Sequence, residues 1–166
     1  MNYKMKYACT GHGIERLRGK EQEVREWLRK QIVDENGFYG VDEDDVLLIC
    51  GGAEGTDELF GSLALDYPKM GLALYLPFHL YRVGEMMDLR NRMNEMYWVS
   101  EVWRRGVDRK RDRMMVNDCD VLLAVWDGIK KGGTWETIKY AMKKGKPIIF
   151  FPMEILYNEY AAAESK

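Results

Sequence analysis

The stretch VLLICGGAEG, which runs from Val46 to Gly55, says more about the fold than any other part of this sequence. Its first five residues form a continuous apolar run, as is typical of a parallel strand covered on both faces. The run breaks abruptly into glycines, and the pattern then predicts a helix as far as Tyr67, which Pro68 helps to end. The stretch therefore predicts a buried strand, a glycine-rich loop and a helix.

The same succession of elements recurs along the chain. A helix is predicted over Lys20–Glu35 and another over Thr134–Lys144, each with apolar residues at helical spacing or a glycine after its end. Between His79 and Gly106 the pattern is less clear, with a helix suggested around Met86–Met93 and a short extended piece at Tyr97–Val99. Four further strands are predicted, at Lys4–Thr10, Leu72–Leu76, Val121–Trp126 and Pro147–Phe151.

Five strands that alternate with helices predict an α/β fold, a Rossmann-like three-layer sandwich with a mainly parallel five-stranded sheet in the order 3-2-1-4-5. We expect one domain over residues 1–166, with a core of about 4–152 and a C-terminal helix or tail at 153–166. Ligands of such sheets bind beyond the carboxyl ends of the strands, where the strand order reverses. The expected cleft lies between the first strand and the strand that ends at Trp126.

Composition narrows the classes of partner. The 166 residues carry 25 basic and 27 acidic side chains, and we do not expect so nearly neutral a chain to bind nucleic acid. No segment approaches the roughly 20 apolar residues of a membrane span, and the start lacks an apolar run, so we expect a cytoplasmic protein without membrane partners. Cys9, Cys50 and Cys119 are expected to be buried thiols, with no metal site and no required cofactor.

Three loops after predicted strands share one physical character. They comprise Thr10–Gly13, Gly51–Asp57 and Asp127–Thr134, and each delivers small residues into the start of a helix. Glycine lets backbone amides approach an anion closely, and a helix N-terminus adds free N–H groups and the positive end of a dipole. One such loop is also an ordinary turn, but three in register favour a site for phosphate or ribose.

A longer series of motifs runs through roughly residues 8–152. It comprises Thr10-Gly11-His12, Gly51 to Asp57, Pro77-Phe78, Arg111 to Asp120, Val125 to Gly128, Gly132-Gly133-Thr134 and Gly145-Lys146-Pro147. The order and spacing of these motifs resemble the SLOG superfamily, in its YpsA-like branch. This Rossmann-like superfamily includes Lonely Guy phosphoribohydrolases, DNA-processing DprA-like domains and sensors in bacterial and phage conflict systems. The resemblance implies a nucleotide or nucleotide-sugar ligand.

The chain departs from the family's pattern at two places. Gly13 and Ile14 follow the Thr-Gly-His motif, where the family usually has a basic residue or proline. Asp112 stands after Arg111, where relatives commonly have asparagine. A polar contact made by that asparagine would be lost or reversed in sign.

The residues expected to bind the ligand come from these loops and from the segments that the resemblance adds. Several have a structural alternative: Asp57 is a favoured helix-start acid, Asp127 either bonds ribose or closes an Asx turn, and His12 either contacts phosphate or caps the turn. The full expected set is Thr10, Gly11, His12, Gly51, Gly52, Gly55, Thr56, Asp57, Pro77, Phe78, Arg111, Asp127, Gly128, Gly132, Gly133 and Thr134.

Glu136 is the candidate catalytic carboxylate, since it lies two residues after Thr134 in the first turn of a helix. Alternatively, the carboxylate of Glu136 complements the helix dipole or binds ribose without taking part in catalysis. Three functions follow: a nucleotide-binding sensor, sequestering or accessory regulatory protein; an N-glycosidic hydrolase or deoxyribosyltransferase-like enzyme; and a protein associated with single-stranded DNA. The surplus of aromatic and methionine side chains in Met86–Trp103 further predicts a homo-oligomer.

Overall fold

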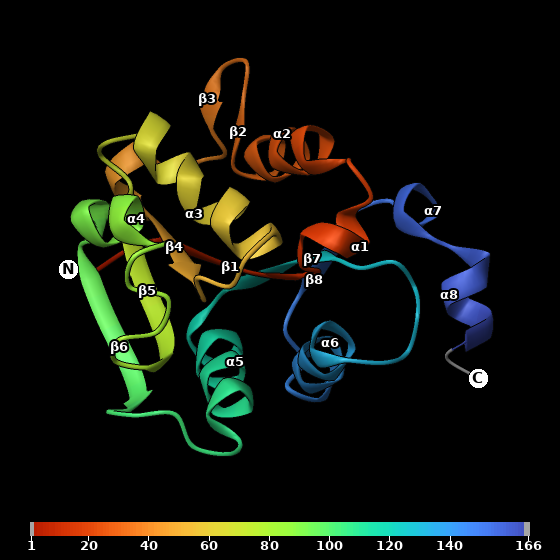
Figure 1. Ribbon diagram of the computed structural model, residues 1–166. Coiled ribbons are helices and arrows are strands. Elements are labelled where there is room, and N and C mark those ends of the chain that lie inside the picture. Colours follow the sequence, from red (N-terminus) through yellow and green to blue (C-terminus); the bar gives the residue numbers. More distant parts are fainter. Residues whose placement is uncertain (1, 165–166) are drawn as a thin grey trace.

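The computed structural model describes residues 2–164 and shows one central sheet between two layers of helices (Figure 1). All neighbouring strands of this sheet are parallel, in the order β6-β5-β4-β1-β7-β8. The strands are β1 (Met5–Gly11), β4 (Val46–Cys50), β5 (Gly71–Phe78), β6 (Glu95–Ser100), β7 (Val121–Val125) and β8 (Ile148–Phe150).

The predicted strand order is confirmed, with one strand added. Predicted strands 3-2-1-4-5 correspond to β5-β4-β1-β7-β8, and β6 extends the sheet beyond β5. This sixth strand includes Tyr97–Val99, where the sequence suggested a short extended piece that was not counted as a strand of the sheet. Its apolar run, Met96–Val99, is only four residues long, and the strand is half-buried or exposed, whereas β4 is buried throughout.

The helices lie on the two faces of the sheet according to the strands that they connect. In Figure 1, α2, α3 and α4 lie above the sheet, and α5 and α6 lie below it. The helices are α1 (Ile14–Leu17), α2 (Glu21–Ile32), α3 (Thr56–Asp66), α4 (Met87–Arg92), α5 (Val107–Asp118), α6 (Gly133–Lys143), α7 (Met153–Leu156) and α8 (Glu159–Glu164).

Two predicted helices differ from the observed ones. The helix expected over Lys20–Glu35 ends at Ile32, because the chain then enters a small hairpin of β2 (Val33–Asp34) and β3 (Gly37–Phe38), joined to β4 by a 3-10 turn at Glu43–Asp45. The C-terminal helix or tail expected at 153–166 consists of α7 and α8, and its last two residues lie outside the described residues.

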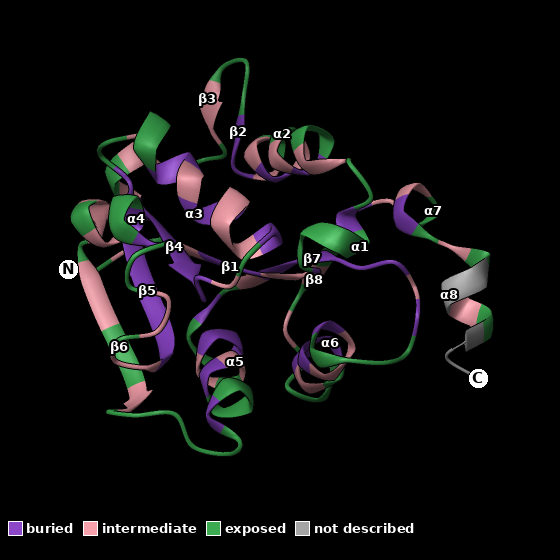
Figure 2. Cartoon of the chain, viewed as in Figure 1, coloured by how far each residue is buried: buried purple, intermediate pink, exposed green. Residues whose placement is uncertain are grey.

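The core has two parts because alternate strand residues point to opposite faces. All of β4 is buried, with Leu48 packed in the cluster on the α2–α3 side and Ile49 in the cluster on the α5–α6 side (Figure 2). The three cysteines are buried and unpaired. Among residues 2–164, no helix is long and apolar enough to span a lipid bilayer.

The two helical layers also position the site. From β1 the chain moves outward through β4, β5 and β6, with helices on one face, and then returns to β7 on the other side of β1. The connections from the adjacent strands β1 and β7 therefore leave in opposite directions. This is the point of strand-order reversal at which α/β sheets form ligand crevices.

Candidate functional site

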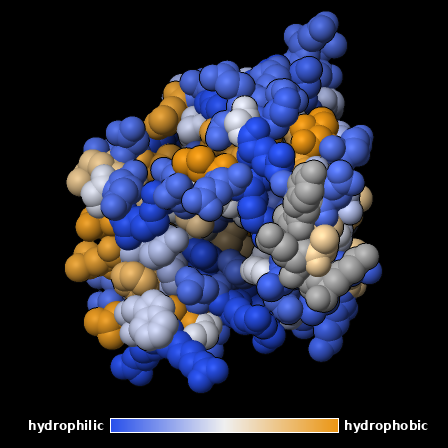
Figure 3. All heavy atoms as spheres, turned by 45° about the vertical axis from the view of Figure 1, so that its right-hand side comes forward, coloured by the Kyte–Doolittle hydropathy of each residue, from blue (hydrophilic) through white to orange (hydrophobic). Residues whose placement is uncertain are grey.

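A cleft of about 290 Å³ lies beside the end of β1, where the connections after β1 and β7 leave in opposite directions, on the face of the sheet that α5 and α6 cover. Its polar wall is formed by the end of β1 and by the first turn of α6, with Thr10, Gly11, Gly133 and Thr134. Its inner end is apolar and is formed by Cys9, Met115, Val116 and Leu122. Figure 3 shows a hollow in the middle of the molecular face, bordered mainly by hydrophilic residues.

The N-terminus of α6 opens onto this cleft without a side-chain cap. Gly132 is the N-cap residue, with a φ of 96°, and within the described chain no side chain bonds the first amides of the helix. A Cβ placed on Gly133 would meet no atom within 4 Å. The first N–H groups of this eleven-residue helix therefore lack a side-chain acceptor, and Gly133 and Thr134, which carry two of them, line the cleft, where an anion could accept hydrogen bonds from them.

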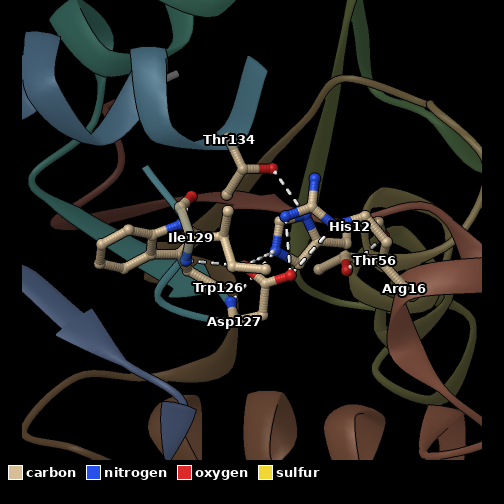
Figure 4. A network of polar contacts seen from close by, with 7 residues as sticks. All are labelled: His12, Arg16, Thr56, Trp126, Asp127, Ile129 and Thr134. Atoms are coloured by element: carbon tan, nitrogen blue, oxygen red, sulfur yellow. Dashed lines mark hydrogen bonds and ion pairs between the residues drawn. The ribbon is translucent and has the colours of Figure 1, made fainter. Parts of the chain in front are cut away.

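His12 lies in the middle of a polar network below the cleft (Figure 4). Its ring is buried, and Nε2 lies 3.1 Å from the backbone N–H of Asp127, which donates to it, while Nδ1 lies 3.4 Å from Oγ1 of Thr134. Burial lowers the pKa of His12 to about 4, although Asp127 opposes the shift. The neutral ring thus joins the loops after β1 and β7 and also lines the cleft.

Asp127 stabilises the loop after β7 and does not line the cleft. Its Oδ1 accepts a hydrogen bond of 3.0 Å from the N–H of Ile129, which closes an Asx turn. Its Oδ2 accepts from Nε and Nη2 of Arg16, at 3.1 and 2.7 Å. Burial opposes ionisation, but the bonds from Arg16 and Ile129 outweigh it, so the pKa of Asp127 lies below its ordinary value. Of the two expected roles, the turn is the one present.

The second glycine-rich loop packs into the first. The N–H and hydroxyl of Thr56 both donate to the carbonyl of His12, at 3.1 and 2.9 Å. A Cβ on Gly55 would lie 2.7 Å from that same carbonyl oxygen, and one on Gly52 would overlap Met86. Among the residues of this loop that were expected to bind ligand, Asp57 lines the cleft, whereas Gly51, Gly52, Gly55 and Thr56 do not.

Arg111 and two carboxylates form the wall opposite α6. Arg111 is 5% exposed, donates from Nη1 to the carbonyls of Gly51 and Tyr75, and donates from Nε to Asp112 at 2.8 Å. Among the described residues, no hydrogen bond uses its Nη2. Burial raises the pKa of Asp57 to about 6 against the opposing effect of Arg111, and burial also raises the pKa of Asp112.

Glu136 lies outside the cleft, in a shallow groove between α5 and α6. It makes ion pairs with Lys139 at 3.0 Å and Arg109 at 3.6 Å, and the hydrogen bond from Lys139 lowers its pKa. The physical reason is helical geometry: Thr134 and Thr137 are three residues apart and both face the cleft, so Glu136 points away from it. The expected catalytic carboxylate is not at this site.

Five other predicted residues do not line the cleft. Pro77 and Phe78 end β5, two strands away from the cleft, and Asp127, Gly128 and Gly132 belong to the loop before α6 without lining the cavity. The cleft does contain Thr10, Gly11, His12, Asp57, Arg111, Gly133 and Thr134 from the predicted set.

Sequence reasoning missed several lining residues, of which Arg16 is the most important because it brings a cationic side chain to the cleft from α1. It lies four residues beyond His12, outside the glycine motif. Met115 and Val116 follow Arg111 and Asp112 at a spacing of four, so an amphipathic face of α5 was the signal that could have found them. Among residues 2–164, the one close group of three possible metal ligands is Asp42, Asp44 and Asp45, which precede β4 at the far end of the sheet.

Compared with models of known protein families and with curated proteins, the chain matches none of them. The chemistry of the cleft therefore rests on its own residues. The cleft offers the amides at the start of α6 and the guanidinium groups of Arg16 and Arg111 to an anion. The carboxyls of Asp57 and Asp112 can bond hydroxyl or amino groups, and the apolar inner end can contact a flat or aliphatic group.

Proposed function

We propose that this cleft binds a nucleotide or another phosphorylated ribose compound. The observation that carries the proposal is the open N-terminus of α6 at the point where the strand order reverses. Unbonded helix amides and the positive end of the helix dipole favour a phosphate group. Arg16, whose side chain is 42% exposed beside these amides, adds a cation that can pair with phosphate oxygens.

The two ends of the cleft fit the two ends of such a ligand. A phosphate beside Gly133 would place the rest of the molecule toward the apolar residues Met115 and Leu122, which suit a base. Asp57 and Asp112 lie between, where carboxylate oxygens can accept hydrogen bonds from ribose hydroxyls. The volume of about 290 Å³ is at the lower limit of roughly 300 Å³ for small-molecule pockets, which favours a mononucleotide over a dinucleotide.

The proposed role is that of a sensor, a sequestering protein or an accessory regulator in the manner of the SLOG superfamily. Membership of that superfamily is part of the proposal, and it rests on the motifs in the sequence. Two of these motifs, Thr10-Gly11-His12 and Gly133-Thr134, line one cavity.

The proposal is tested by a thermal-shift panel of nucleoside monophosphates, cyclic dinucleotides and ADP-ribose derivatives, because a ligand that binds only the folded state raises the melting temperature. Gly133→Asp should weaken binding at least tenfold, since it places a carboxylate at the phosphate position. Gly84→Asp is the matched control, because a Cβ there also meets no atom within 4 Å and Gly84 is outside the cleft. No shift with any compound, or equal binding by both variants, would contradict the proposal.

A second candidate function, N-glycosidic hydrolysis, is favoured by the position of Asp57. This carboxyl lines the cleft and holds its proton up to about pH 6. It could therefore protonate the leaving nitrogen as the C–N bond breaks, and the resulting carboxylate could take the proton that the water loses as it adds to the anomeric carbon. Release of free base by the wild-type chain, lost in Asp57→Asn while binding persists, would support this function. Binding without base release would leave ligand binding as the function and exclude hydrolysis of the compounds tested.

A further inference from the structure

The strand β6 lies at the edge of the sheet. Hydrogen bonds to β5 show which of its backbone N–H and C=O groups face β5 and which face outward. The N–H of Asn94 donates to the carbonyl of Leu72 at 2.8 Å, and the carbonyl of Ser100 accepts from the N–H of His79 at 3.0 Å. Even-numbered residues thus face β5. Because successive residues alternate, the outward-facing N–H and C=O groups belong to the odd-numbered residues Glu95, Tyr97 and Val99. Within residues 2–164, no strand pairs with them.

Between the charges at its two ends, Glu95 and Glu101, this edge lacks the features by which proteins normally prevent pairing of edge strands. The stretch Met96–Ser100 contains no charge, proline or glycine. Tyr97 and Trp98 are 43% and 38% exposed, and Trp103, in the loop after the strand, is 63% exposed. Figure 2 shows the contrast between β6, drawn as intermediate and exposed, and its buried neighbour β5. Such an edge is suited to pairing with another strand.

We propose that a second copy of this chain occupies the edge, with the two β6 strands antiparallel about a twofold axis at Tyr97. The two sheets then form one continuous sheet across the dimer. This interface is independent of the proposed nucleotide site, because none of its residues lines the cleft.

Backbone geometry and charge select this register. Only the backbone groups of odd-numbered residues face outward, so the pairing must place odd-numbered residues opposite odd-numbered residues. This requires the twofold axis to pass through a residue of the strand, and the central candidates are Met96, Tyr97 and Trp98. An axis at Trp98 would place Glu95 opposite Glu101 of the other copy, and directly opposed like charges destabilise a sheet. An axis at Tyr97 places Glu95 opposite the neutral Val99 and Trp98 opposite Met96, whose sulfur can contact the indole ring. An axis at Met96 pairs fewer residues of the strand.

The exposed aromatic side chains at and after β6 supply part of the area that a stable interface needs. Aromatic side chains bury roughly 150–250 Å² each, so the exposed fractions of Tyr97, Trp98 and Trp103 amount to roughly 300 Å² per copy. A typical stable interface takes about 800 Å² from each partner, so the paired backbone of β6 and the residues beside it must supply the rest.

Disulfide trapping tests both the dimer and its register. In the proposed register the two Tyr97 Cα atoms are about 5.5 Å apart, within the range that a disulfide bridges, so Tyr97→Cys should cross-link rapidly on mild oxidation. Ser100→Cys is the matched control, because its two copies would be roughly 20 Å apart. The three native cysteines are buried and should not interfere.

The unmodified chain, examined by sedimentation over a wide range of concentration, should reach twice its mass of 19.4 kDa. Val99→Pro should remain monomeric with a nearly unchanged melting temperature, since the N–H that it removes faces outward. A wild-type mass of 19.4 kDa at every concentration, or cross-linking of Ser100→Cys as fast as Tyr97→Cys, would overturn the proposal.

Discussion

Two glycine-rich loops that look alike in the sequence have different physical roles in the structure. GGAEGTDE at Gly51–Glu58 and GGTWE at Gly132–Glu136 both deliver a Gly-Thr pair into a helix. At the start of α3, the N–H and hydroxyl of Thr56 are bonded to the carbonyl of His12. At the start of α6, no side chain of the described residues bonds the first amides, and Gly133 and Thr134 line the cleft. Glycine allows close packing of backbone in the first loop and access for a ligand in the second.

The difference shows why a glycine motif alone does not locate a binding site. The two loops differ in the space around their glycines. A Cβ added to Gly55 would overlap the backbone of the neighbouring loop, whereas a Cβ added to Gly133 would have no atom within 4 Å. Substitutions at the two loops should therefore separate stability from binding.

Gly55→Ala should have the largest effect on stability. The added Cβ would lie 2.7 Å from the carbonyl oxygen of His12, and the φ of 97° is unfavourable for alanine. We expect a loss of about 3 kcal/mol or more in the free energy of unfolding, measured by urea denaturation. A loss below about 1 kcal/mol would show that the two loops are not packed as described.

The buried His12 should make the protein sensitive to acid. Its pKa of about 4 in the folded state is below the ordinary 6.5, so the unfolded state binds more protons between these values and stability falls as the pH drops through this window. The maximum loss is about 3 kcal/mol. Asp57, with its pKa raised to about 6, acts with the opposite sign, because acid favours its folded form.

The two effects partly cancel in the wild type, so the Asp57→Asn variant is the one to measure. Its free energy of unfolding should fall more steeply than that of the wild type as the pH drops from about 6.5 to about 4. A further His12→Asn change should remove most of that slope. If the slope is the same with and without His12, the ring is not buried and neutral as the structure indicates.

Thr56→Val should have an intermediate effect. The substitution keeps the shape of the side chain but removes the hydroxyl that bonds the carbonyl of His12 at 2.9 Å. We expect a loss of about 1–2 kcal/mol in the free energy of unfolding, because the buried hydrogen bond is not replaced. Thermal denaturation measures it, and Thr56→Ser, which keeps the hydroxyl, is the control.

Gly133→Ala should have the smallest effect on stability. Its Cβ has open space and its φ is not in the left-handed region, so the free energy of unfolding should change by less than about 0.5 kcal/mol. Calorimetry of the variant beside Gly55→Ala compares the two loops directly. A loss as large as that of Gly55→Ala would remove the distinction between them.

Much of the fold could be predicted because inner strands such as β4 and β7 are continuous apolar runs and short glycine-containing loops follow them. For β6 the sequence suggested only a short extended piece, since its apolar run of Met96–Val99 is brief and lies among polar and charged residues. In the site, the loops were found, but the sequence does not show which amides are already bonded. Glu136 was selected by its distance from Thr134 along the chain, whereas the direction of its side chain depends on the helical turn.

The most direct test of the central claim is an amide NMR titration of the isotope-labelled protein with a nucleoside monophosphate. We predict that the resonances of Gly133 and Thr134 shift in proportion to occupancy, while those of Gly52 and Gly55 change little. Shifts confined to Gly52 and Gly55, or no shift at either loop at saturating concentration, would contradict the account.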